Sequence, residues 1–230
     1  MSARGFTVAL IGCDGAGKTT VARALERESG LPIRYLYMGV SVDSSNRALP
    51  TTRLAHAIKR ARGAPPDTAG PREPASAAPR AAAGPVRRAR RSVRSALRLA
   101  NRVAEEWYRQ LLAASELRRG RIVVFDRHFT ADYHAADVTA GDRTLSRRLH
   151  GYVLTRLYPQ PDLVVLLDAP PEVLYARKGE GTIGSLGRRR AEYMQLGSTL
   201  ERFAVVDATL PLPVVVRDVT EIVRGHEARR

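Results

Sequence analysis

The stretch Gly12-Cys13-Asp14-Gly15-Ala16-Gly17-Lys18-Thr19-Thr20 decides the fold of this chain. It fits the phosphate-loop pattern Gly-x-x-x-x-Gly-Lys-Thr, it follows an apolar run over 6–11, and it leads into a helix-forming segment over 19–28. A strand, a glycine-rich loop and a helix in this order are the setting that the pattern requires. The glycines let successive backbone N–H groups turn toward a phosphate, and the helix N-terminus adds partial positive charge. The sequence therefore predicts a binding site for a nucleoside triphosphate.

Each residue type in this loop has an expected task. Lys18 supplies a point charge for the β- and γ-phosphates of ATP, and the Thr19 hydroxyl is a ligand for Mg²⁺. Cys13 is expected to fill a small-residue position rather than to act as a reactive thiol. The residues expected to bind ATP are Gly12, Asp14, Gly15, Ala16, Gly17, Lys18, Thr19 and Thr20.

Apolar and helical segments alternate along the rest of the chain. Besides 6–11, we expect strands over 33–38, 121–126, 163–168 and 203–207, and helices over 51–62, 92–118, 145–158, 171–178, 188–200 and 213–224. Continuous apolar strands that are joined by helices are typical of a parallel sheet covered on both faces. The predicted fold class is α/β: one P-loop domain over 1–230, with a doubly wound, five-stranded parallel sheet flanked by helices.

The positive charge of the chain is unevenly distributed. The formal net charge is +15, and residues 50–102 hold thirteen basic residues against two acids, which leaves +11 in that segment. Part of it, 63–91, is rich in Pro, Ala and Arg and is predicted to be a disordered insert, because it cannot bury enough apolar surface to offset its ordering entropy. The basic segment lacks aromatic residues before Trp107, so we do not expect nucleic acid to be the main partner.

Composition also bounds the cellular setting. The single cysteine rules out an internal disulfide and is typical of a reducing compartment. No run approaches the roughly 20 apolar residues of a membrane span, and the N-terminus lacks the apolar core of a secretory signal. The expected location is cytoplasmic, with no membrane span.

Acidic residues end three of the predicted strands. Because ligands bind at the carboxyl ends of the strands in such sheets, Asp126-Arg127-His128, Asp168 and Asp207 are candidates for the site. A carboxylate at position 126 can orient Mg²⁺ or its waters, so Thr19 and Asp126 form the predicted metal site. The planar guanidinium of Arg127 suits a phosphate. For His128, an ordinary loop histidine is the favoured interpretation.

Four stretches of this sequence resemble the thymidylate kinases and their relatives among the P-loop nucleoside-monophosphate kinases. They are the loop 12–20 with Asp14 inside it, Asp126-Arg127-His128, the stretch Pro161-Asp162-Leu163-Val164-Val165-Leu166-Leu167-Asp168-Ala169-Pro170-Pro171-Glu172-Val173, and Val205-Val206-Asp207-Ala208. The resemblance covers most of the chain except the insert.

The resemblance implies a role for several residues. Asp14 would face a hydroxyl of the acceptor sugar, and Arg127 would bind the acceptor phosphate. Segment 177–190 would be a mobile lid that supplies positive charge to the phosphates, because Gly15 stands where some family members carry a basic residue. Its cations are Arg177, Lys178, Arg188, Arg189 and Arg190, and together with Lys18, Asp14 and Arg127 we count Arg177 among the catalytic residues. The family also suggests a homodimer through the helices that flank the third strand.

The sequence departs from the family at the acceptor site. The segment Arg-Glu-Pro-Gly-Gly that follows the second strand in thymidylate kinases is replaced by Met38-Gly39-Val40-Ser41-Val42. Three functions therefore stay open at this point. The first is transfer of the γ-phosphoryl group of ATP to a nucleoside monophosphate, the second is the same transfer to another small acceptor such as a sugar or a phosphorylated metabolite, and the third is a nucleotide-dependent regulatory module.

Overall fold

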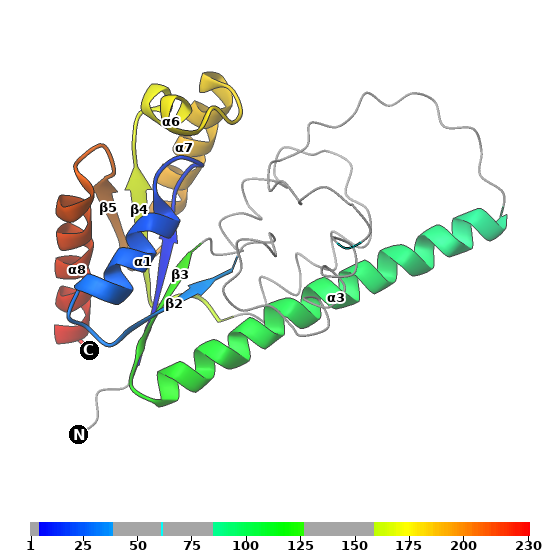
Figure 1. Cartoon of the computed structure of the whole chain (residues 1–230), viewed down its shortest axis with the longest axis horizontal. Helices are drawn as coiled ribbons and strands as arrows, with labels where there is room; N and C mark the ends of the chain where they lie inside the picture. Colours follow the sequence, from blue (N-terminus) through cyan, green and yellow to red (C-terminus); the bar gives the residue numbers. More distant parts are fainter. Residues whose placement is uncertain (1–4, 39–60, 62–84, 127–158) are drawn as a thin grey trace.

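The computed structural model describes residues 5–38, 61, 85–126 and 159–230. The elements in chain order are β1 (Thr7–Ile11), α1 (Lys18–Glu28), β2 (Ile33–Tyr37), α3 (Pro85–Arg118), β3 (Ile122–Asp126), β4 (Leu163–Asp168), α6 (Pro171–Lys178), α7 (Ile183–Gly197), β5 (Phe203–Asp207) and α8 (Leu212–Ala228) (Figure 1). The predicted helices over 51–62, apart from Ala61, and over 145–158 lie outside the described residues.

The five strands form one parallel sheet in the order β2-β3-β1-β4-β5. This confirms the predicted fold class. The strand order changes direction at the central strand β1, since β3 lies on one side of it and β4 on the other. In open α/β sheets, ligands bind beyond the carboxyl ends of the strands at this point. The phosphate loop, which follows β1 directly, therefore lies at the place where such sheets usually bind their ligands.

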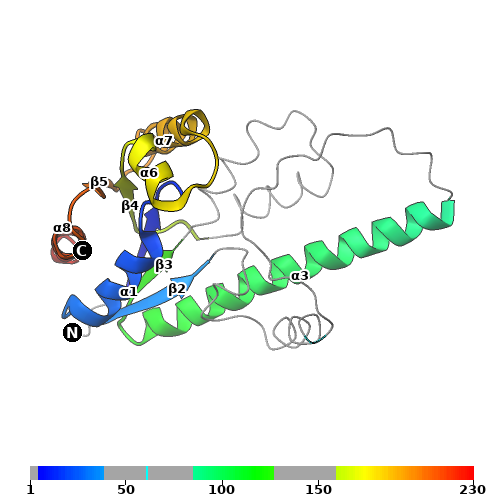
Figure 2. The ribbon, with the colours of Figure 1, turned by 45° about the horizontal axis from the view of Figure 1, so that its top comes forward.

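Helices cover both faces of this sheet. The buried apolar residues form two clusters, a larger one that includes α1, called the main core here, and a smaller one that includes α3. Along β3, Ile122 and Val124 belong to the main core, whereas Val123 and Phe125 pack with Ala113 of α3. Because alternate residues of a strand point to opposite faces, α1 and α3 lie on opposite sides of the sheet. Helix α8 contacts α1 and the strands β4 and β5 (Figure 1). Helices α6 and α7 contact each other near the carboxyl ends of β1 and β4 (Figure 2).

Helix α3 begins earlier than the sequence predicts. It starts at Pro85 rather than at residue 92, so residues 85–91 of the predicted insert are helical, which corrects that part of the prediction. Proline favours the first position of a helix, and the Arg and Ala residues that follow have high helix propensity. The first part of the helix extends well beyond the sheet (Figures 1 and 2). The remainder of the insert, 63–84, lies outside the described residues.

The predicted lid also differs from the structure. Helix α7 starts at Ile183 rather than at residue 188, because Thr182 and Ser185 form a capping box in which each side chain accepts a hydrogen bond from the other residue's backbone N–H. Gly184 and Gly187 are thus helical and not part of a mobile loop. Segment 177–190 consists of the end of α6, a connection over 179–182 and the start of α7. Helix α8 is longer at both ends than the predicted 213–224.

Folding stability is expected to depend on one histidine. His226 in α8 is only 3% exposed, its ring lies 4.9 Å from that of Phe6, and its Nε2 atom has no hydrogen-bond partner among the described residues. Burial lowers the pKa of His226 below its ordinary value near 6.5, and the nearby Arg202 and Arg230 lower it further. Below that ordinary value the unfolded chain therefore binds more protons than the folded one.

We expect the free energy of unfolding to fall as the pH drops from 7 to 5, by up to about 1.4 kcal/mol per pH unit from this group. Urea unfolding of the wild type and of His226→Phe at several pH values measures the effect. In the variant this part of the acid sensitivity should disappear. An identical pH dependence in both proteins would show that His226 does not cause it.

Candidate active site

The phosphate loop can only be built with glycine at particular positions. Gly12, Gly15 and Gly17 have φ angles of +144°, +90° and +84°, a region that L side chains rarely adopt. A Cβ atom on Gly12 would lie 2.5 Å from the carbonyl oxygen of Leu167, and one on Gly15 would lie 2.7 Å from that of Leu174. The loop is therefore wedged against β4 and α6. With this backbone, any side chain at position 15 would collide with α6.

Lys18 places its charge directly at this loop. Its buried Nζ donates hydrogen bonds to the carbonyl oxygens of Gly12, at 2.7 Å, and of Cys13, at 2.8 Å. Because Lys18 is the first residue of α1, its ammonium group and the helix N-terminus add positive charge in the same place. Phosphate oxygens are charged acceptors, with which an ammonium group forms stronger hydrogen bonds than with neutral carbonyls.

A buried carboxylate lies beside the loop. Asp126, at the end of β3, is fully buried, and its Oδ2 accepts hydrogen bonds from Thr19 Oγ1 at 2.5 Å and from the Tyr35 hydroxyl at 3.3 Å. Its Oδ1 atom has no hydrogen-bond partner among the described residues. The structure thus brings together the two residues that the sequence predicts for the metal site. It adds a third, Tyr35, which the sequence analysis does not predict.

This donor set fits Mg²⁺. The ion usually takes one or two oxygen ligands from the protein and completes its coordination with water and substrate phosphates. A hydroxyl and a buried carboxylate with an unpartnered oxygen at the phosphate loop meet that requirement. Within the described ranges there is no group of three or more His, Cys, Asp and Glu residues that could hold a metal without such help.

Asp14 is paired with cations from the lid segment. Its Oδ2 accepts a hydrogen bond from Arg189 Nη1 at 3.3 Å, and Lys178 Nζ lies 4.0 Å from its Oδ1. An acid next to a phosphate site repels the ligand, and these two cations offset that repulsion. They come from α6 and α7, so Asp14 joins the loop to both helices. The acceptor hydroxyl that the family resemblance assigns to Asp14 stays a prediction.

The other lid arginines make different contacts. Arg190 forms a bidentate ion pair with Asp168 at the end of β4, with both N···O distances at 2.7 Å. Arg177 donates a hydrogen bond from Nη1 to the carbonyl oxygen of Ala208, at 2.8 Å, in the turn after β5. Both guanidinium groups therefore bind protein acceptors, and the role of Arg177 in catalysis stays a prediction.

The loop cysteine is not activated. Cys13 is buried, and this burial raises the pKa of its thiol to about 11. A thiol with so high a pKa is protonated at neutral pH and is a poor nucleophile. Cys13 therefore occupies a small-residue position, in agreement with the expectation from the sequence.

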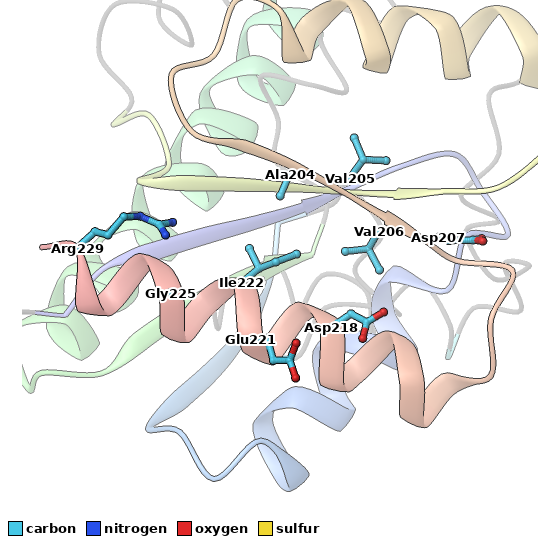
Figure 3. Close-up of a pocket in the computed structure, with 9 residues that line it drawn as sticks. All are labelled: Ala204, Val205, Val206, Asp207, Asp218, Glu221, Ile222, Gly225 and Arg229. Atoms are coloured by element: carbon cyan, nitrogen blue, oxygen red, sulfur yellow. The ribbon is translucent and has the colours of Figure 1, made fainter.

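A separate groove of about 550 Å³ lies between β5 and α8 (Figure 3). Its lining includes Asp207, Asp218 and Glu221, with Arg229 at the other end. Three carboxylates would repel a triphosphate. Moreover, no residue of the phosphate loop is among those that line this groove. We therefore do not assign the nucleotide to this groove.

Two of the residues that the sequence predicts near the site lie outside the described residues. Arg127 and His128 follow β3 directly but lie outside the described residues, so the contact of Arg127 with an acceptor phosphate stays a prediction.

Among the described helices, none has the length and apolar character needed to cross a bilayer.

The parallel sheet and its phosphate loop define an α/β protein of the P-loop class. No protein-family model matches the sequence. Among solved structures, the chain is similar to the thymidylate kinase from Candida albicans, with a TM-score of 0.62 and 17% sequence identity. The match covers 100% of this chain and 96% of that one. At this identity the likeness shows the fold, which is that of a thymidylate kinase.

Proposed function

We propose that this protein is an ATP-dependent phosphotransferase of the thymidylate kinase type, which transfers the γ-phosphoryl group of ATP to the phosphate of a nucleoside monophosphate. The observation that carries the proposal is the cluster of Lys18, Thr19 and Asp126 around a complete phosphate loop at the switch point of the sheet. Its position in a fold like that of a thymidylate kinase over the whole chain supports the same conclusion.

Each part of the cluster has a task in this reaction. The loop amides and Lys18 would bind the β- and γ-phosphates of ATP, and Thr19 and Asp126 would hold Mg²⁺, which neutralises charge on the phosphate oxygens. Lys178 and Arg189, which contact Asp14 in the loop, would bring further positive charge to the transferred group. Such charge stabilises the transition state of phosphoryl transfer.

The acceptor site forms the second half of the proposal. Arg127 would bind the acceptor phosphate, and Asp14 would accept a hydrogen bond from an acceptor hydroxyl. Broad substrate specificity is described for the C. albicans enzyme. In this chain, a sequence that starts at Met38 stands where thymidylate kinases carry Arg-Glu-Pro-Gly-Gly. Because of this difference, phosphorylated sugars should be tested as a second class of acceptor beside the nucleotides.

A coupled assay of ADP release tests the function directly. ATP and Mg²⁺ are supplied with a panel of nucleoside monophosphates and phosphosugars. We expect turnover with at least one nucleoside monophosphate. Turnover with phosphosugars alone would show that the acceptor is a phosphosugar and not a nucleoside monophosphate. No turnover with any acceptor, together with nucleic-acid binding that weakens steeply with salt, would favour the regulatory module instead.

A homodimer is also part of the proposal. Val93, Trp107 and Leu111 of α3 are 59%, 40% and 62% exposed. At 100° per residue, these three positions lie on one face of the helix, together with the exposed Ala100 and Ala104. An apolar stripe of this kind is suited to pairing with a second copy. Sedimentation analysis of the wild type and of Leu111→Glu measures the state, and the variant should be monomeric.

The substitution Asp14→Asn is expected to separate two tasks of the loop. If Asp14 binds the acceptor, kcat/KM for the acceptor falls by about tenfold or more, because one charge-assisted contact is lost. ATP affinity should be unchanged or higher, since Arg189 and Lys178 keep their charges while the acid that repels the phosphates is removed. Calorimetry with ATP and steady-state kinetics with varied acceptor measure the two effects.

The opposite pattern would contradict the acceptor role of Asp14. If ATP affinity, melting temperature and activity all fall together in Asp14→Asn, the residue stabilises the loop and its contacts to α6 and α7. Glu180→Gln is the matched control, because it removes an exposed carboxylate that also pairs with Lys178, at 2.9 Å, but lies outside the loop.

A further inference from the structure

The Asp126 carboxylate has two oxygens in very different surroundings. Oδ2 accepts two hydrogen bonds, one from Thr19 and one from Tyr35, whereas Oδ1 has none among the described residues. Asp126 is 0% exposed, so the missing bonds are not replaced by bulk water around the side chain. A buried, unpartnered carboxylate oxygen is costly, unless a cation or an ordered water molecule lies against it.

Thr19 alone does not determine the orientation of this carboxylate. A single donor leaves the carboxylate free to rotate about its Cβ–Cγ bond, which is a soft torsion. The second donor comes from another direction, because Tyr35 belongs to β2 and Thr19 belongs to α1. Two donors from different elements on the same oxygen hold the carboxylate plane and leave the other oxygen available.

Tyr35 is itself held firmly. Its ring is buried in the main core, and the guanidinium carbon of Arg23 lies 6.0 Å from the ring centroid. Its backbone N–H donates a hydrogen bond to Glu26 Oε1 at 3.2 Å. The strand pairing of β2 with β3 brings Tyr37, two residues further on, opposite Asp126. The hydroxyl of Tyr35 therefore reaches Asp126 from a residue that core packing and strand pairing hold in place.

We propose that Tyr35 is a positioning residue of the metal site: its hydroxyl holds Asp126 Oδ2 so that Oδ1 faces the Mg²⁺ ion or its waters. This inference rests on the proposed function, because it assumes that a metal–nucleotide complex binds at the loop. Partners behind metal ligands commonly change metal affinity by 10- to 100-fold when they are removed. Because the Tyr35 hydrogen bond is long, at 3.3 Å, we expect an effect of about tenfold.

The test compares Tyr35→Phe with the wild type in binding Mn²⁺, used as a spectroscopic probe for Mg²⁺, in the presence of ADP. Electron paramagnetic resonance measures free Mn²⁺, and calorimetry measures ADP affinity in EDTA without any metal. The expected result is an Mn²⁺ affinity lowered about tenfold with ADP affinity in EDTA unchanged. General damage to the fold would lower both affinities.

Tyr37→Phe is the matched control, because it removes the hydroxyl of another buried tyrosine in the same strand. The two hydrogen bonds to Asp126 Oδ2 come from Thr19 and Tyr35, so this variant keeps both of them. It should leave Mn²⁺ affinity within about twofold of the wild type.

Equal Mn²⁺ affinity in Tyr35→Phe and the wild type would overturn the positioning role and leave the proposed function intact. If the wild type itself binds neither ADP nor Mn²⁺ with ADP, the proposed function fails and the inference falls with it. A parallel loss of ADP affinity in EDTA would assign Tyr35 to the stability of the loop and would also overturn the inference.

Discussion

ATP affinity is expected to fall by about 10- to 100-fold when Lys18 is replaced by alanine. The ammonium group is buried at the phosphate loop, where it already binds two carbonyl oxygens. Losing a charge-assisted hydrogen bond to phosphate costs about 1.5–3 kcal/mol. Phosphoryl transfer should fall further than binding, because the same charge also stabilises the transition state. Calorimetry with ATP and the ADP-release assay measure the two quantities.

A control variant must separate the loss of the Lys18 contact with ATP from the loss of one positive charge anywhere on the protein. Arg217→Ala removes one positive charge from an exposed site on α8, where the arginine forms an ion pair with its neighbour Asp218. It should leave ATP affinity unchanged. Urea unfolding of both variants confirms that folded protein is compared. Equal ATP affinity in Lys18→Ala and the wild type would refute the nucleotide site.

The substitution Gly15→Ala is expected to destabilise the protein by about 3 kcal/mol and to abolish measurable ATP binding. The residue has a φ of +90°, and its new Cβ would lie 2.7 Å from the backbone oxygen of Leu174. Backbone strain and overpacking each cost on the order of 1–3 kcal/mol. The strained φ and the clash both favour a shift of the loop, and such a shift would displace the amides that we expect to bind the phosphate. Differential scanning calorimetry should show a melting temperature lower by about 6–12 °C.

Gly179→Ala is the matched variant for this prediction. Gly179 has a φ of +66°, but a Cβ there meets no atom within 4 Å. Only the backbone strain remains, which costs about 1 kcal/mol. If the two alanine variants melt at the same temperature and bind ATP equally well, the contact with α6 does not constrain the loop.

Local sequence patterns are sufficient to predict several strands and helices near the carboxyl edge of the sheet. The strand 163–168, the helix 171–178 and the strand 203–207 have in the structure the bounds that the sequence predicts. Apolar runs of five or six residues between turns, and a proline at a helix start, are signals contained within a few neighbouring residues. The predicted start of α7 is wrong, because the capping box at Thr182 and Ser185 begins the helix five residues earlier than its apolar pattern indicates.

The phosphate loop and its candidate residues are likewise predicted from the sequence. Lys18, Thr19 and Asp126 can be predicted as site residues because a phosphate loop needs these residue types at a set spacing, and because the carboxyl ends of parallel strands lie at one edge of the sheet. The order of the strands is not contained in these patterns. It depends on which apolar faces pack together, and that choice is made among segments far apart in the chain.

Only the tertiary structure decided which side chains meet around the loop. Asp14 and Arg189 are 175 residues apart, and Tyr35 and Asp126 are 91 residues apart. No local pattern marks such pairs, because a contact over this distance depends on the packing of whole helices and strands. The sequence by itself determined that a phosphate loop follows the first strand. The packing of α6 and α7 on that loop, and of β2 beside β3, determined which charges and hydroxyls surround it.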